Sequence, residues 1–221
     1  MLKGNAQITE GQKFEILAAI SKSAPAIFGE MDSTTAQSWI ENPKGLQKVL
    51  KKALCPSVET INFPIWKTIE LGTGLKTADD FRKAIEASGY KISKWASDIL
   101  NKQAFTVASE KTELDLVKIT GVDLGFTKNV TRKKIYDRAI KLGLELCPNE
   151  SGPQLRLQYK DQPNGEWLYI AIEPIVVSDG DLNVFLVTRD DDDPWLNASC
   201  DSLGDLWGPG SMWVFVSPRR K

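Results

Sequence analysis

Residues 154–159 read Gln-Leu-Arg-Leu-Gln-Tyr and open the last third of the chain. Apolar and polar side chains alternate there with a period of two, which is typical of a half-buried strand. Similar patterns follow, and we expect strands near 154–159, 166–173, 182–188 and 211–217. The dipeptide Asn164-Gly165 favours a tight hairpin between the first two of them. The sequence therefore predicts a C-terminal β block from about residue 153.

The chain before this block is patterned differently. Over the first 55 residues, apolar residues recur at helical spacing, and Asn42-Pro43 is typical of the start of a helix. Over 61–221, a strand is expected at 65–71, helices within 77–101 and a further helix at 131–142, ahead of the β block. We therefore expect an α+β fold. It would have a helical N-terminal region (1–60) and an α+β domain (61–221) that ends in a mixed or antiparallel sheet.

Composition excludes several classes of protein. The chain has 221 residues, 42% of them hydrophobic and 26% charged, which is ordinary for a globular protein. It has no apolar run of about 18 residues, so neither a membrane span nor a membrane partner is expected. The first residues lack the apolar core of a signal peptide, which predicts a cytoplasmic location. A net charge of −1 gives no general attraction to nucleic acid.

The chain contains no histidine. This excludes Ser-His-Asp and Cys-His catalysis and every histidine-ligated metal site. The three cysteines, Cys55, Cys147 and Cys200, are odd in number and widely spaced, so we expect small buried thiols rather than a disulfide framework. No catalytic residue, metal site or cofactor is predicted.

Two tryptophans of the β block lie in segments rich in Asp, Gly, Asn and Ser, whereas Trp167 and Trp213 fall in expected strands and are predicted to be core. A loop tryptophan is either a lid over a small core or a surface for a ligand. Four consecutive aspartates nearby repel one another, which a cation or a basic partner would relieve. We therefore expect a non-enzymatic recognition module for a protein, peptide or carbohydrate ligand, bound by Trp195, Trp207, Asp191, Asp192 and Asp193.

A nucleic-acid-binding regulator is one alternative. Residues 77–101 read as helix, glycine turn and helix, and the helix at 131–142 opens with three basic residues before a β block. Trp95 shares a face with Ile99, which favours a packed helical hairpin over a DNA-reading one. The residues that this alternative would use are Arg132, Lys133, Lys134 and Lys94.

A carboxylate-based hydrolase is the other alternative. It would use Glu166 and Glu173 as its paired carboxylates, but seven positions along one strand place them on opposite faces. The turn at Gly72–Thr77 lies where a phosphate-binding loop would lie, yet its spacing does not match that motif. An ordinary glycine turn before a helix cap explains it.

Several phrases of the chain resemble a family of uncharacterised proteins predicted from the genomes of small-genome candidate-phylum bacteria. The resemblance runs from about Trp39 to the end of the chain. It implies a bacterial origin and brings no activity, cofactor or site residue with it. The phrases that carry it lie at Leu71–Ala84, Gly143–Pro148, Gly152–Tyr159, Glu166–Leu168 and Trp213–Val216.

Overall fold

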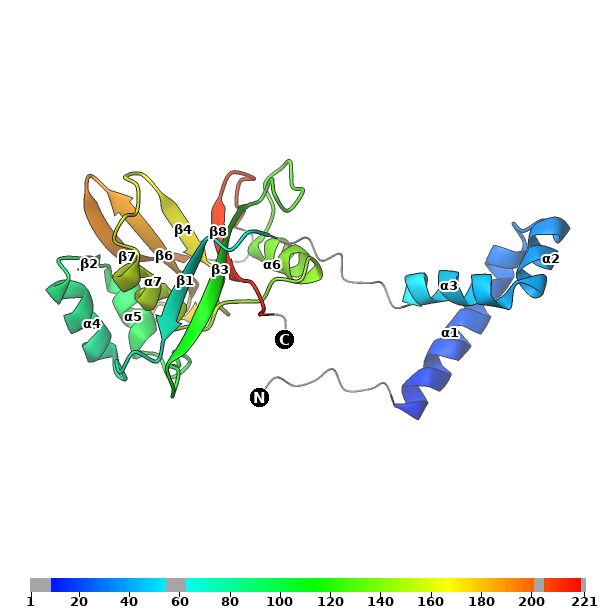
Figure 1. The fold of residues 1–221 in the computed structure, drawn as a ribbon, viewed down its shortest axis with the longest axis horizontal. Helices are drawn as coiled ribbons and strands as arrows, with labels where there is room; N and C mark the ends of the chain where they lie inside the picture. The colour runs from blue at the N-terminus through cyan, green and yellow to red at the C-terminus, as the bar shows by residue number, and fades with distance from the viewer. Residues whose placement is uncertain (1–8, 55–62, 201–204, 220–221) are drawn as a thin grey trace. The chain divides into compact units, whose positions relative to one another are not determined.

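A computed structural model describes residues 9–54, 63–200 and 205–219 of the chain, except the side chains of residues 52 and 53. The chain divides into two compact units, Met1–Ser57 and Val58–Lys221 (Figure 1). The division expected at residue 60 falls outside the described residues.

The N-terminal unit, called the helical unit below, contains α1 (Glu10–Phe28), α2 (Ser33–Glu41) and α3 (Pro43–Leu54). Local capping explains where each begins. Thr9 and Gln12 form a capping box at α1, and Asp32 accepts a hydrogen bond from the backbone N–H of Thr35 at α2. Asn42 accepts one from Gly45 N–H at 2.8 Å, and α3 begins at proline as predicted. No residue of α1 or α2 is buried.

The C-terminal unit, called the sheet unit, is built on a mixed sheet that curves into a half-barrel. The strand order is β1-β3-β8-β4-β6-β7-β2, with β5 paired to β6. The strands β4 and β8 run parallel, as do β2 and β7, and the other pairs are antiparallel. The strands are β1 (Lys67–Leu71), β2 (Lys91–Ile92), β3 (Thr112–Thr120), β4 (Trp167–Ile170), β5 (Ile175–Val176), β6 (Leu182–Asp190), β7 (Asp193–Cys200) and β8 (Met212–Val216).

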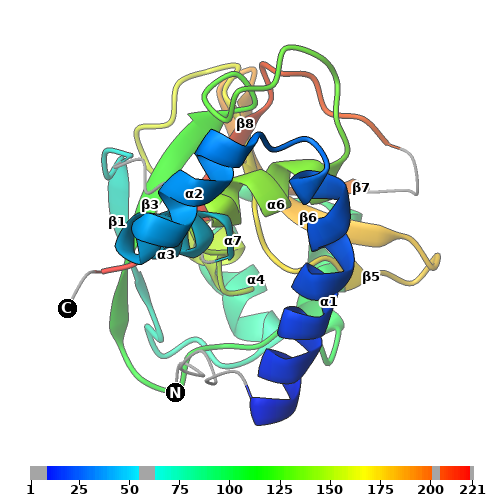
Figure 2. The same ribbon diagram turned by 90° about the vertical axis from the view of Figure 1, so that its right-hand side faces the viewer.

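Helices cover both faces of this sheet. In Figure 1, α4 (Ala78–Ala87), α5 (Lys94–Asn101) and α7 (Ser151–Gln158) lie on one side of β3 and β8, and α6 (Arg132–Lys141) lies on the other (Figures 1 and 2). Each side has its own core, which we call the inner and the outer core. The inner core contains Phe81, Leu155 and Phe185, and the outer core contains Tyr136 and Trp213. The expected α+β fold with its C-terminal sheet is confirmed.

The strand predicted at 154–159, and with it the hairpin at Asn164-Gly165, is wrong. Residues Ser151–Gln158 form α7, and every side chain from Ser151 to Arg156 is buried. The polar side chains that suggested a solvated face make internal hydrogen bonds instead. Gln154 donates to the hydroxyl of Thr73, and Gln158 donates to the carbonyl of Glu70. Because both faces of the segment are buried, the alternation of apolar and polar side chains did not indicate which of them face solvent.

Arg156 is the largest polar group in this interior, and it is fully buried. Its guanidinium donates to the carbonyls of Thr188 and Tyr159 and to the side chain of Gln162. It also lies 4.8 Å from the centre of the Tyr90 ring. Burial lowers the pKa of Arg156 to about 10, so it remains charged at neutral pH. α7 is thereby joined to β6 from inside the half-barrel.

Within residues 9–54, 63–200 and 205–219, no helix combines the length and apolarity that crossing a membrane requires.

Candidate functional site

Trp207 lies in the outer core. Only 7% of its surface is exposed, and its ring contacts Tyr169 and Trp213, with ring centres 6.4 and 5.7 Å away. Its backbone pairs with Val130 in an isolated bridge. Of the two roles open to a loop tryptophan, Trp207 therefore has that of a lid over a core. It is not available to a ligand, which corrects the expectation that it binds one.

Trp195 lies in a strand rather than in a loop. It belongs to β7, which the sequence did not predict, and it is half-buried. The ammonium of Lys91, in the neighbouring strand β2, lies 5.3 Å from the centre of its ring. The indole is therefore covered in part by a cation of the chain and remains partly exposed.

The acidic run is a tight hairpin turn between β6 and β7. Asp191 and Asp192 have φ of 50° and 66°, the left-handed conformation that a two-residue hairpin turn needs, and aspartate tolerates it better than most residues. Cations of the chain itself offset the charge, since Asp193 pairs with Lys91 and Asp192 lies 3.5 Å from Arg189. Turn geometry thus accounts for these aspartates, and their contact with a ligand stays a prediction.

Trp167 is more exposed than its sequence pattern predicts. It was expected in the core, yet half of its surface is exposed. In β4, Trp167 and Tyr169 are more exposed than Leu168 and Ile170, which are buried in the inner core. The alternation was visible in the sequence. The sequence did not show which face of the strand would be covered by a helix.

Strand register places Trp167 and Trp195 on the same face. Trp167 is opposite Thr188, and Thr188 is opposite Trp195. Directly opposed residues of antiparallel strands point to one side of a sheet, so the two indoles flank a buried threonine on the central strand β6. Tyr169, two residues from Trp167, belongs to the outer core and shows that this is the outer face.

Hydrogen-bonding groups surround the two indoles. Asp190 accepts a hydrogen bond of 2.8 Å from the Trp167 indole N–H, which holds that ring in place. Asn197 donates to the hydroxyl of Thr188 at 3.0 Å. We call Trp167, Thr188, Trp195, Asp190 and Asn197 the outer-face aromatic site. It combines two partly exposed, positioned rings with polar groups at their edges, the composition of a recognition surface.

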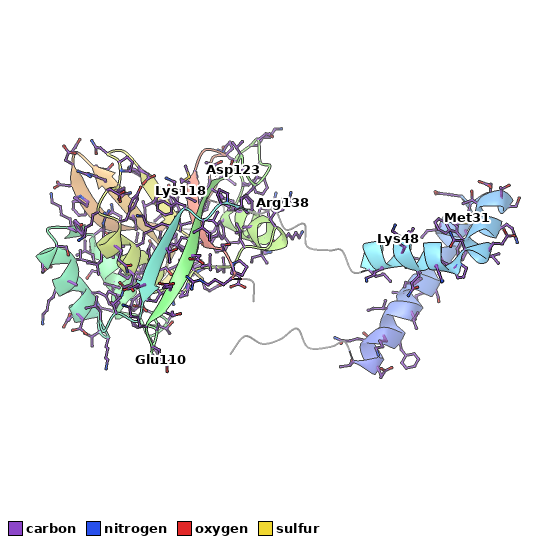
Figure 3. All side chains as sticks on the ribbon, in the orientation of Figure 1. Met31, Lys48, Glu110, Lys118, Asp123 and Arg138 are labelled. Carbon is purple, nitrogen blue, oxygen red and sulfur yellow. The ribbon has the colours of Figure 1, made fainter. Side chains whose placement is uncertain are left out.

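The proposed pair of catalytic carboxylates is not supported by the contacts of Glu166. Its carboxylate accepts a hydrogen bond of 2.7 Å from Lys118, a β3 residue labelled in Figure 3, and the ammonium of Lys118 lies 4.8 Å from the centre of the Trp66 ring. Burial and the neighbouring Glu166 raise the pKa of the Tyr159 hydroxyl. Glu173 lies exposed beyond the end of β4. Glu166 is thus neutralised by a lysine, and the hydrolase stays a hypothesis that no observed contact favours.

The residues of the nucleic-acid alternative are largely engaged by the chain. Lys133 pairs with Asp137 at 2.7 Å, and Arg132 lies 4.9 Å from the centre of the Tyr136 ring. Lys134 is exposed. This alternative also stays a prediction for α6.

The α4–α5 pair packs as a structural hairpin. Arg82 of α4 donates hydrogen bonds to the side chains of Ser97 and Asn101 on α5. These are side chains that a DNA-reading helix would need for contacts with the bases. Lys94 lies 4.7 Å from the Trp95 ring centre and lines a hollow of about 440 Å³. Asp98 and Asp179 line the same hollow, which gives it acidic groups that a nucleic acid would repel.

Anion and metal sites find no support among the described residues. The backbone N–H of Gly72, where a phosphate would bind, donates to the buried carboxylate of Glu150. No group of three or more cysteine or acidic side chains in the described part of the chain is placed to hold a metal ion. Cys147 is a buried thiol, as predicted, and burial raises its pKa. Cys200 is exposed, contrary to prediction, and Cys55 falls outside the described residues.

In comparisons with protein-family models, with curated proteins and with solved structures, nothing matches the chain. The resemblance noted in the sequence stays a prediction. The site must therefore be interpreted from its own geometry.

Proposed function

We propose that the sheet unit is a non-enzymatic recognition module that binds a carbohydrate on the outer-face aromatic site. The observation that carries the proposal is the placement of Trp167 and Trp195 on one face of the sheet, on either side of Thr188. The apolar face of a sugar ring stacks on an indole, and its hydroxyl groups bond to carboxylates and amides such as those of Asp190 and Asn197.

The spacing of the two rings favours an oligosaccharide over a single sugar. Trp167 and Trp195 are on the two strands that flank β6, so their backbones lie roughly 10 Å apart, at about 4.8 Å per strand. Such a separation exceeds one sugar ring. A half-exposed tryptophan that is held by a hydrogen bond also loses little conformational freedom on binding.

Calorimetric titration of the full chain with soluble β- and α-linked oligosaccharides tests the proposal. We expect binding to at least one of them, weakened at least tenfold, about 1.4 kcal/mol, by Trp167→Ala and by Trp195→Ala. Trp95→Ala, which removes a half-buried tryptophan outside the site, is the matched control and should leave affinity unchanged.

Far-UV circular dichroism checks that these variants fold. Binding that persists in both site variants would overturn the proposed site. No binding of any oligosaccharide at millimolar concentration would overturn the ligand class. Binding of a peptide instead, lost in Trp195→Ala, would reassign the same surface to peptide recognition.

A further inference from the structure

The helical unit carries an apolar groove of about 990 Å³, lined by residues of all three of its helices. Its lining includes Ile20 and Ile27 of α1, Trp39 of α2, and Val49 and Leu50 of α3. Nine of the residues that line it are large, exposed hydrophobic residues, and leaving such a cluster in water is unfavourable. The groove therefore has the character of an interaction surface.

A second apolar stripe lies on α1. Phe14, Leu17 and Phe28 are 70%, 58% and 64% exposed. At 100° per residue these positions lie within about 60° of one another around the helix axis. Phe28 also lines the groove, whereas Phe14 and Leu17 do not. The unit thus presents both an apolar groove and an apolar helix stripe, the two halves of a helix-in-groove contact.

The charges of the unit favour one kind of occupant. Residues 23–42 carry three acidic residues (Glu30, Asp32 and Glu41) and no basic one, whereas residues 43–54 carry four lysines and no acidic one. None of the described charged side chains lines the groove itself, but the acidic ones lie on α2 and the connection before it and the lysines lie on α3; we call these elements its acidic and basic sides. Figure 3 labels Met31, a lining residue at the α1–α2 connection, and Lys48 on α3. A uniformly acidic or basic partner would be repelled by one of these sides.

A second copy rotated about a two-fold axis that runs along the groove complements both sides at once, because each acidic side then faces a basic one. We propose that the helical units of two chains pair through this groove in a symmetric homodimer. The inference goes beyond ligand recognition by the sheet unit and does not depend on it.

Charge reversal in the full chain tests the proposal by analytical ultracentrifugation. One variant carries Lys44→Glu, Lys48→Glu and Lys51→Glu, which makes both sides acidic, and the other carries Glu30→Lys and Glu41→Lys, which makes both sides largely basic. All five positions are exposed, so both variants should fold, as far-UV circular dichroism can check.

We expect the wild type to dimerise and each reversed variant to do so at least tenfold more weakly, because like charges then face each other. An equimolar mixture of the two variants should restore association as a heterodimer. Lys160→Glu, an exposed reversal in the sheet unit, is the matched control and should leave the dimer unchanged. A wild type that stays monomeric at all concentrations would overturn the proposal. So would a mixture that associates no better than its components.

Discussion

The helical unit and the sheet unit bury their apolar side chains to very different extents. Of the seventeen large hydrophobic side chains that are exposed among the described residues, eleven lie in the helical unit, which is the smaller of the two. The sheet unit has two cores, and its largest buried side chain is Trp213. The sheet unit therefore completes its fold with its own residues, whereas the helical unit has local capping but leaves its apolar groove open.

The largest expected difference between the two units is in the free energy of unfolding lost when a large apolar side chain is replaced by alanine. Trp213→Ala should lower the free energy of unfolding by about 3–5 kcal/mol, because the ring is fully buried against Tyr136 and Tyr169. This loss should be the same at every protein concentration. Leu50→Ala, in the open groove, should cost less than about 2 kcal/mol, and its cost should vary with concentration through the dimer.

Urea denaturation at several protein concentrations measures both effects. A concentration-dependent loss in Trp213→Ala, or equal losses in the two variants, would remove the distinction between the two units.

A glycine-to-alanine substitution should change stability in opposite directions in the two units. Gly152→Ala would place a methyl group 2.5 Å from the ring of Phe185, where α7 meets β6, so we expect a loss of about 1–3 kcal/mol. In α1, the methyl group of Gly11→Ala has its nearest neighbour at 3.9 Å. There, the higher helix propensity of alanine should stabilise the helix by about 0.5 kcal/mol.

Thermal unfolding followed at 222 nm gives the sign of each change. Two destabilising substitutions, or two neutral ones, would contradict the difference in packing between α7 and α1.

The smallest expected effect is the loss of stability at low pH. Hydrogen bonds from Arg219 and Thr68 lower the pKa of Asp115, while in the helical unit hydrogen bonds from Thr35 lower the pKa of Asp32. A lowered pKa in the folded state means that the unfolded chain binds more protons just below pH 4, so the stabilisation is complete above that pH and is lost as the pH falls further.

Asp115→Asn should therefore lower the Tm by a few degrees at pH 6 and by less at pH 2. Melting curves of the wild type and the variant at low salt, between pH 2 and 7, test this. A Tm difference that stays constant over that range would show that the Asp115 carboxylate does not act through its charge.

Much of the fold was predictable because its signals are local. The capping box at Thr77 and Asp80 and the proline at the start of α3 act within one helical turn, and the helices they predict are present. The strands β6 and β8 also lie where alternation and turn residues predict them. Only part of the candidate site followed from the sequence. Trp195 was a candidate from the sequence, but Trp167 was assigned to the core.

The sequence by itself determined the starts of helices with local capping signals, such as α3 and α4, the α+β class and the lack of histidine, since these depend on near neighbours or on composition. Tertiary structure alone decided that residues 151–158 form a buried helix and that Trp207 lies in a core. It also decided that Trp167 and Trp195 share a face. Each of these outcomes depends on which strand lies beside which and on which face a helix covers. Those contacts join residues far apart in the chain, and local patterning carries no record of them.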